Sequence, residues 1–227
     1  MGDRAAKEAL YNRLTDVAKT LGHGHRAELV DVLAQGERSV DVLANEIGQS
    51  KANTSHHLQV LARAGLVTTR RDGNRVYYRL SSERVAELWS ALRDVAAHHV
   101  AGISSLVDAY LGPRDSIATI TRDELASSLD TGNVVVLDVR PLSEYEAGHI
   151  PNAVPIDPAR LHEQLRKVPH HADVVAYCRG SYCAYAFEAI RTLESQGIQA
   201  RRLEEGFPEW RRAGLPFATG TPTTAEV

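Results

Sequence analysis

The chain has 227 residues and a formal net charge of −3; 43% of the residues are hydrophobic and 24% are charged. Because one domain usually has about 100 to 150 residues, this length predicts two domains with separate cores. Two cysteines, Cys178 and Cys183, are too few for a disulfide-stapled secreted scaffold. The sequence has no apolar run of about 18 residues and no signal-peptide pattern at its start, so we expect a cytoplasmic protein with no membrane partner.

Charge is unevenly distributed along the chain. Residues 1–112 carry 14 basic and 13 acidic side chains, whereas residues 113–227 carry 12 and 16. Within residues 51–80 there are six basic side chains and one acidic side chain. Contacts to DNA phosphates require such a local excess of positive charge, but a basic face that only meets solvent would show the same excess. The predicted secondary structure is therefore needed to distinguish these two interpretations.

The first half predicts a mainly helical domain. Apolar spacing favours helices near residues 4–21, 24–35, 39–47 and 52–64. Alternating residues in 66–71 and 75–80 flank Asp72-Gly73-Asn74, which indicates a β-hairpin. A long amphipathic helix is expected over 82–111, ended by Gly112-Pro113. Helices followed by a hairpin and a terminal helix describe a winged helix-turn-helix over residues 1–112.

One segment of this half resembles a known family. Gln49-Ser50, the run from Ser55 to Val67 (SHHLQVLARAGLV) and the arginine-rich hairpin resemble the ArsR family of bacterial repressors. The resemblance implies a homodimer, formed by the first and last helices, that reads a pseudo-palindromic double-stranded operator. Small polar side chains at the start of a recognition helix reach bases and phosphates, and arginines suit the wing. The DNA-binding residues expected are Ser50, Asn53, Thr54, Ser55, His56, Gln59, Arg70, Arg71 and Arg75.

A metal site in this half is the weaker alternative. The adjacent His56 and His57 attract that interpretation, but no cysteine or acidic cluster accompanies them. Asp94, His98 and His99 do not reproduce the spacing of the family's metal ligands. We therefore predict no metal and no other cofactor, and keep a metal- or arsenite-responsive repressor as a second alternative.

The second half, residues 113–227 with a core near 117–217, alternates strands and helices. Thr121 is a helix N-cap with Glu124 at the capping-box position. Continuous apolar runs at 134–138 and 174–177 predict parallel strands buried on both faces, and 184–193 predicts a helix. The fold class is therefore an α/β domain with a parallel sheet.

Cys178 follows the second of these apolar runs, where loop amides and a helix N-terminus favour a thiolate. Four motifs in order, LDVR at 137–140, EYEAGHIPNA at 144–153, YCRG at 177–180 and GFPEW at 206–210, resemble the rhodanese family. The resemblance implies that Cys178 accepts sulfane sulfur as a persulfide. The donor would be thiosulfate, polysulfide or a low-molecular-weight persulfide. The expected site is completed by Arg179, Cys183, the supporting pair Asp138 and Arg140, and a substrate loop of Gly180, Ser181 and Tyr182.

Three features of this site leave alternatives open. Arg179 either adds positive charge to the loop or points into solvent. Cys183 is either a resolving thiol that attacks a Cys178 persulfide or a small side chain turned into the core. Glu205 stands where the family often has the first of two glycines. Related phosphatases and arsenate reductases carry an arginine at the position of Ala184, so its absence argues against oxyanion transfer.

The first half resembles DNA-binding repressors and the second half resembles sulfurtransferases, so two functions are possible for the whole chain. The leading hypothesis is a transcriptional repressor whose rhodanese-like domain senses reactive sulfur through Cys178. The alternative is an enzyme, a rhodanese-type sulfurtransferase that passes sulfur to a thiol acceptor and is directed or regulated by the DNA-binding half.

Overall fold

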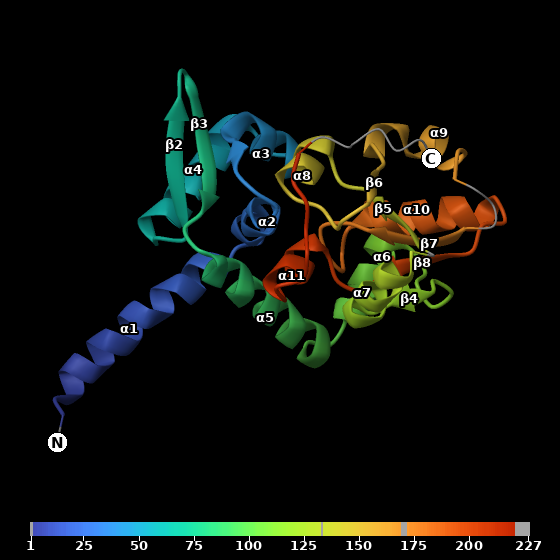
Figure 1. Cartoon of the computed structure of the whole chain (residues 1–227). Helices are drawn as coiled ribbons and strands as arrows, with labels where there is room; N and C mark the ends of the chain where they lie inside the picture. The colour runs from blue at the N-terminus through green and yellow to red at the C-terminus, as the bar shows by residue number, and fades with distance from the viewer. Residues whose placement is uncertain (1, 133, 169–171, 221–227) are drawn as a thin grey trace. The chain divides into compact units, whose positions relative to one another are not determined.

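The computed structural model describes residues 2–132, 134–168 and 172–220. The chain divides into two compact units, Met1–Val100 and Ala101–Val227, each with its own core (Figure 1). None of the helices among the described residues combines the length and apolar character needed to cross a membrane.

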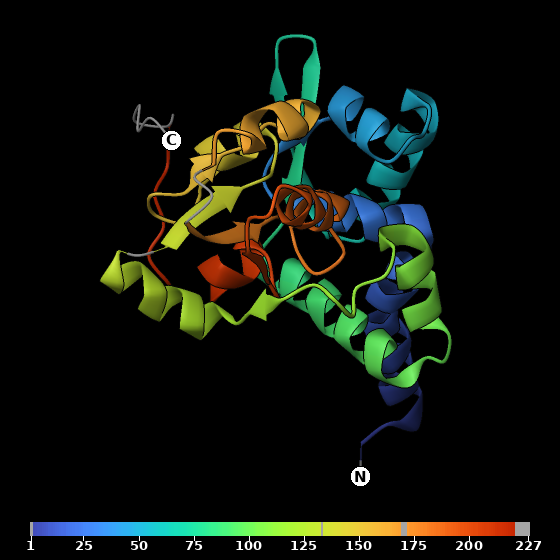
Figure 2. The same ribbon diagram turned by 90° about the vertical axis from the view of Figure 1, so that its right-hand side faces the viewer.

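The first unit is a winged helix-turn-helix, as predicted. Its elements are α1 (Arg4–Leu21), α2 (Gly24–Leu33), β1 (Arg38–Ser39), α3 (Val40–Glu46), α4 (Lys51–Arg63), β2 (Val67–Asp72), β3 (Arg75–Leu80) and α5 (Glu83–His99). Its core gathers the apolar faces of α2, α3 and α4 with residues of β2, β3 and α5. The hairpin of β2 and β3 projects from these helices, and α1 carries the N-terminus at its free end (Figures 1 and 2).

Local chemistry explains the turn between α3 and α4. Gly48 has a φ of 60°, in the left-handed region that glycine adopts without a steric penalty, and it ends the first helix. Ser50 then caps α4, because its hydroxyl oxygen accepts from the Asn53 amide at 3.2 Å. In the wing, Asp72 pairs with Arg75, so Gly73 and Asn74 form a two-residue hairpin turn.

The helix expected over 82–111 is two helices. α5 ends at His99, Val100 is extended, and α6 (Ile103–Leu111) begins after Gly102, which has a φ of 85°. A left-handed residue interrupts an α-helix, so the prediction of one continuous helix was wrong here. The helical spacing of apolar residues continues across the break, although the two helices pack in different places. Leu111, at the end of α6, belongs to the core of the second unit.

The second unit is an α/β domain, as predicted. After α6 it contains β4 (Thr119–Ile120), α7 (Arg122–Thr131), β5 (Val134–Asp138), α8 (Leu142–Ala147), β6 (Val154–Pro155), the 3₁₀ turn η1 (Pro158–Arg160), α9 (Leu161–Leu165), β7 (Asp173–Tyr177), α10 (Ala184–Ser195), β8 (Ala200–Leu203) and α11 (Phe207–Arg212). The strands form a five-stranded sheet in the order β4-β8-β7-β5-β6, and every pair is parallel.

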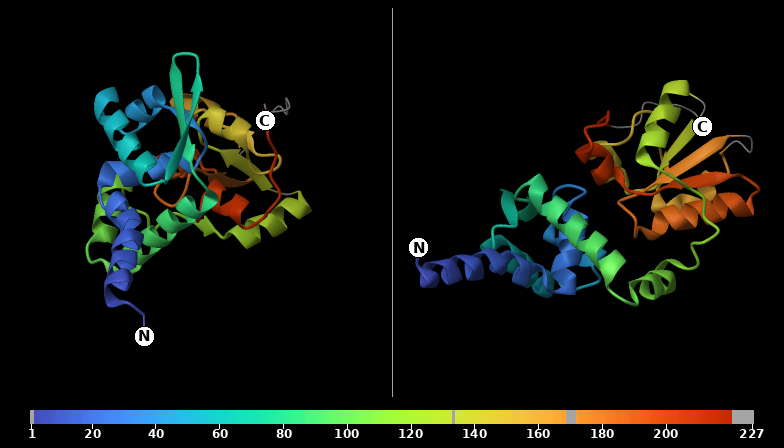
Figure 3. Two further views of the ribbon diagram at one scale, coloured as in Figure 1. Left: turned by 90° about the vertical axis from the view of Figure 1, so that its left-hand side faces the viewer. Right: turned by 90° about the horizontal axis from the view of Figure 1, so that it is seen from below.

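Helices cover both faces of this sheet (Figure 3). One face packs on α10 and α9 through alternate residues that include Leu137, Val174 and Ala176. The other packs on α7, α8 and α11 through Val136, Val175 and Tyr177. Because both faces are buried, β5 and β7 are almost entirely apolar, and the polar and reactive side chains gather at their carboxyl ends.

Candidate functional site

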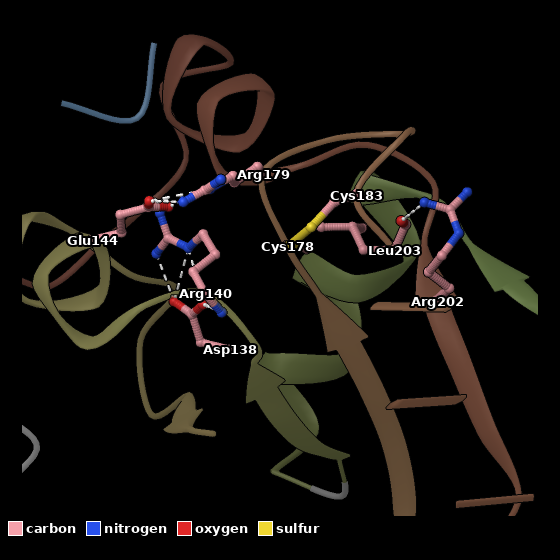
Figure 4. Close-up of a disulfide and its surroundings, with 8 residues drawn as sticks. All are labelled: Asp138, Arg140, Glu144, Cys178, Arg179, Cys183, Arg202 and Leu203. Atoms are coloured by element: carbon pink, nitrogen blue, oxygen red, sulfur yellow. Dashed lines mark hydrogen bonds and ion pairs between the residues drawn. A yellow bond between two sulfur atoms is a disulfide. The ribbon is translucent and has the colours of Figure 1, made fainter. Parts of the chain in front are cut away.

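The two cysteines lie at the carboxyl edge of the sheet, in the loop between β7 and α10. Cys178 directly follows the last residue of β7 and is 1% exposed, and Cys183 is the N-cap residue of α10. Their sulfur atoms form a disulfide, with the Cα atoms 6.1 Å apart (Figure 4). The sulfur of Cys183 therefore reaches Cys178, which is the geometric requirement of a resolving thiol.

The start of the cysteine loop is held by the segment that leads into α11. The Phe207 amide donates to the Cys178 carbonyl oxygen at 3.1 Å. A Cβ at Gly206 would lie 2.4 Å from the carbonyl group of Arg179, so this position has room only for glycine. The preceding residue, Glu205, binds Arg122 through its carboxylate at 2.9 Å. The close backbone approach thus needs the second of the two expected glycines and tolerates the glutamate at the first.

The substrate-loop residues predicted from the sequence lie along the rest of this turn. Gly180 is buried, and its carbonyl oxygen accepts from the Cys183 amide at 3.2 Å. The Ser181 hydroxyl donates to the Glu204 carbonyl oxygen at 3.1 Å, and Tyr182 is half-buried against the core under α10. Hydrogen bonds therefore fix the loop at Cys178, Ser181 and Cys183, and the disulfide joins its first and last residues.

Arg179 follows neither of its two expectations. Its Nη2 lies 2.6 Å from Oε1 of Glu144, its Nε is 3.1 Å from both carboxylate oxygens, and its side chain is only 14% exposed. The Glu144 side chain is fully buried. The guanidinium is thus committed to a buried carboxylate of α8, pointing away from the disulfide (Figure 4), and it anchors the loop.

Asp138 and Arg140 form a second buried ion pair, at the carboxyl end of β5. The Asp138 carboxylate accepts from Arg140 Nε at 2.9 Å and from the Tyr177 hydroxyl at 2.5 Å, while Arg140 Nη2 also donates to the Gly148 carbonyl oxygen at 2.7 Å. Burial, and then the charge of Asp138, raise the pKa of Tyr177 well above its usual range, so the phenol stays protonated and donates. Both charged side chains join β5 to β7 and α8, which matches a supporting role.

On the first unit, the predicted base-reading residues run from Ser50, the N-cap of α4, to Gln59 in the second half of the helix. His56 and Gln59 are exposed, Ser55 is half-buried, and Asn53 donates from Nδ2 to Gln49 Oε1 at 2.8 Å. Ser50 uses its hydroxyl to cap the helix, so its role there is structural as well. Exposed amide and imidazole groups on one helix end are the side chains that read base edges in a major groove.

One predicted contact on α4 has to be withdrawn. Thr54 is fully buried, and its hydroxyl donates to the Ser50 carbonyl oxygen at 3.0 Å. The side chain lies on the inner face of α4 with Leu58, so it cannot reach DNA without unfolding the helix.

The three wing arginines predicted to contact DNA differ in their surroundings. Arg70 binds Glu37 through Nη2 at 2.7 Å, lies 3.3 Å from Asp72 and stacks over Tyr77. Its hydrogen bonds to Glu37 and then Asp72 raise the pKa of its guanidinium. Arg71 and Arg75 are exposed on either side of the hairpin turn. Arg79, near the other end of β3, is also exposed and donates to the Thr68 hydroxyl at 3.3 Å, so the wing presents positive charge at its tip and along β3.

Histidines gather on the inner side of α4. The ring centroid of His57 lies 4.6 Å from that of His23 and 5.6 Å from that of His25, and His57 is 6% exposed. Across residues 2–132, 134–168 and 172–220, no group of three or more His, Cys, Asp or Glu side chains could hold a metal ion.

Sequence reasoning missed two residues that shape the cysteine loop, Glu144 and Gly206. Both lie inside motifs that were recognised, but their roles depend on contacts with Arg179. Glu144 is 35 positions from its partner, a separation that no local pattern can reveal. The position of Glu144 beside the apolar Tyr145 on a short helix could have indicated a buried carboxylate that needs a cationic partner.

Comparisons with known proteins match both units. A family model described as "Rhodanese-like domain" matches residues 121–213, and one described as "Helix-turn-helix domain" matches residues 21–70. An HTH-type transcriptional regulator of Mycobacterium tuberculosis, Rv0324, is 42% identical over 97% of this chain and 97% of its own length. The biofilm growth-associated repressor of Xylella fastidiosa is 38% identical over 39% of this chain and 78% of its own length.

A solved structure resembles the first unit. It is the homodimeric winged helix-turn-helix DNA-binding domain, fragment 1–100, of a possible ArsR-family transcriptional regulator from Mycobacterium bovis. It is 40% identical, covers 44% of this chain and 93% of its own length, and superposes with a TM-score of 0.41.

Proposed function

Because the chain belongs to the HTH-type transcriptional regulators that join an ArsR-type winged helix-turn-helix to a rhodanese-like domain, we propose that it is a sulfur-responsive repressor. In this proposal the first unit binds operator DNA as a homodimer. The second unit accepts sulfane sulfur on Cys178, and the modification weakens DNA binding through the segment around residues 111–116.

The observation that carries the proposal is the position of Cys178. It lies at the carboxyl end of a buried parallel strand, in front of the N-terminus of α10, and a second sulfur is within bonding distance. Amides at a helix N-terminus stabilise a thiolate or a persulfide anion. A buried cysteine with this support is suited to reversible sulfur chemistry on a protein whose other half binds DNA.

The dimer is supported by apolar side chains that the single chain leaves uncovered. On α1, Leu10, Tyr11 and Leu14 are 56%, 59% and 62% exposed. On α5, Leu88, Leu92 and Val95, spaced along one helical face, are 43%, 45% and 57% exposed. A second copy of the chain would cover both stripes, and two copies would present two recognition helices to a pseudo-palindromic operator in the cytoplasm.

A binding titration tests the proposal. The probe is a DNA duplex selected by the reduced protein from a random library, at a stated salt concentration. We expect polysulfide to weaken binding by the wild type and to leave Cys178→Ser bound with unchanged affinity. If polysulfide leaves the wild-type affinity unchanged, the sensing role is wrong.

The enzyme alternative is favoured by the match to the rhodanese-like domain, and kinetics separates it from the sensor. Turnover of thiosulfate with cyanide at rates on the order of 1 per second or more would point to a working sulfurtransferase. Release of DNA by metal or arsenite in a variant without both cysteines would instead point to a site in the first unit.

A further inference from the structure

Cys183 occupies a position that suits an attacking thiolate. It is the N-cap of α10, a helix of 12 residues with no acidic side chain in its first turn. The amides at the start of a helix favour a negative charge on the capping residue. Cys178, in contrast, is 1% exposed and packs within the apolar core under α10. Cys183 packs against the edge of the same core but is only half-buried, so it lies at a helix end while Cys178 is enclosed.

The loop holds the two sulfurs together with its anchors in place. Their Cα atoms are 6.1 Å apart, within the usual range for a disulfide. With the disulfide closed, the Phe207 amide donates to the Cys178 carbonyl oxygen and Arg179 donates to Glu144. The anchored loop thus accommodates the closed disulfide.

We propose that Cys183 is the resolving residue of the site and converts a Cys178 persulfide into the Cys178–Cys183 disulfide. This inference rests on the proposed function, because it requires that Cys178 first accept a sulfane sulfur. In that first step the Cys178 thiolate attacks the outer sulfur of a low-molecular-weight persulfide, and the donor leaves as its thiol. The Cys183 thiolate then attacks Sγ of Cys178, the bond between Sγ and the outer sulfur breaks, and the outer sulfur leaves with the electron pair as hydrosulfide.

The balance of these steps requires no further oxidant. Two cysteine thiols are oxidised to a disulfide, and the sulfane sulfur is reduced to hydrosulfide. The product is the state seen in the structure. In it Cys178 is enclosed and has no free thiolate, so the site cannot accept another sulfur until a dithiol reductant opens the bond. The domain would respond once per reduction, which suits a sensor better than a sulfurtransferase that has to keep its persulfide for an acceptor.

The test uses the full-length protein, reduced, freed of reductant and held without oxygen, then mixed with glutathione persulfide. Hydrosulfide is measured, and the intact mass identifies the product. For the wild type we expect one hydrosulfide per chain and a mass lower by two hydrogens. For Cys183→Ser we expect a mass higher by one sulfur, held on Cys178, and no hydrosulfide above the buffer control. Serine is a preferred N-cap residue, so this variant should keep α10 folded.

Each other result has a definite meaning. A stable persulfide or a trisulfide on the wild type would overturn the inference, as would equal hydrosulfide release or a glutathione adduct on Cys183→Ser. If Cys183→Ser takes up no sulfur while its circular dichroism is that of the wild type, the proposed function itself fails. Ser195→Ala, altered at the far end of α10 where the hydroxyl donates to the Thr192 carbonyl oxygen, is the matched control and should behave as the wild type, while Cys178→Ser should neither gain sulfur nor release hydrosulfide.

Discussion

Asp138 lies at the end of β5 with no exposed side-chain surface, and its carboxylate meets both Arg140 and the Tyr177 hydroxyl. Burying two opposite charges costs desolvation energy, which good geometry and further hydrogen bonds offset. Arg140 adds a hydrogen bond to the Gly148 carbonyl oxygen and lies over the Phe207 ring, 4.4 Å from its centroid. This pair therefore connects β5, β7, α8 and α11 behind the cysteine loop.

Replacing the charge of Asp138 should destabilise the second unit. In Asp138→Asn the guanidinium of Arg140 stays buried without its counter-charge, so we expect a loss of about 3 to 5 kcal/mol in the free energy of unfolding, measured with urea. Asp173→Asn is the control, because Asp173 pairs with Arg201 at the surface and is 52% exposed. That change should cost less than about 1 kcal/mol. Equal losses in the two variants would contradict the buried-pair argument.

His57 should make the stability of the first unit sensitive to acid. Burial, followed by the nearby His23, His25, Arg26 and His56, lowers its pKa. As the pH falls through about 6.5, the unfolded chain binds a proton that the folded chain resists, so stability is present above that pH and is lost below it. Glu28 lies 3.9 Å from His25, and burial raises the pKa of its carboxyl.

Thermal unfolding between pH 8 and pH 5.5 measures this dependence. We expect the wild type to lose stability across that range and His57→Gln to lose less. His56→Gln removes only the last and smallest of the causes that lower the pKa of His57, so it should retain most of the wild-type slope. A His57→Gln profile parallel to that of the wild type would assign the acid sensitivity to other groups.

At the scale of single elements, residue patterns within a few positions of each other predicted the helix cap and the hairpin correctly. Contacts between residues far apart in the sequence could not be predicted in this way. The capping box of α7 follows from a spacing of three: the Thr121 amide donates to Glu124 Oε2 at 2.9 Å, and the Glu124 amide donates to the Thr121 hydroxyl at 3.3 Å. The hairpin follows from alternation around Gly73 in the same way. Periodicity alone could not locate the break at Gly102, because helical spacing continues on both sides of it.

In the candidate site, too, local patterns predicted the positions of residues but not their distant contacts. The position of Cys178 follows from the apolar run before it, and that of Cys183 from the helix after it. The surroundings of Arg179 depend on a carboxylate 35 positions away, and the burial of Thr54 depends on how α4 rotates against α2. Spacing along the chain carries no information about such pairings, so the surroundings of Arg179 were left open and the exposure of Thr54 was predicted wrongly.

The wing is expected to contact phosphates through its tip. Arg71→Ala and Arg75→Ala should each weaken DNA binding and reduce the slope of log affinity against log salt by about one. Arg70→Ala is the comparison, because Arg70 is ion-paired with Glu37 and Asp72, and its slope should change less. Titrations at several salt concentrations measure all three. A larger effect from Arg70 than from Arg71 and Arg75 would contradict phosphate contacts through the tip.

At the scale of the whole molecule, each unit closes its own hydrophobic core, yet the first unit leaves large apolar side chains on α1 and α5 in solvent. Exposed apolar stripes on two helices of one unit mark an association surface. DNA binding by such a unit depends on pairing, since two linked recognition helices gain affinity that one lacks.

Charging this surface should separate the dimer without unfolding the chain. Leu14 and Leu92 are 62% and 45% exposed in the single chain, so Leu14→Glu and Leu92→Glu remove little packing within it. In a dimer each change would bury a carboxylate against apolar side chains. We expect monomers by light scattering, unchanged circular dichroism and DNA affinity lower by roughly 100-fold or more. Leu142→Glu, at an equally exposed leucine of α8 in the second unit, should remain dimeric and bind DNA normally. Dimers in both α1 and α5 variants would place the interface on another surface of the chain.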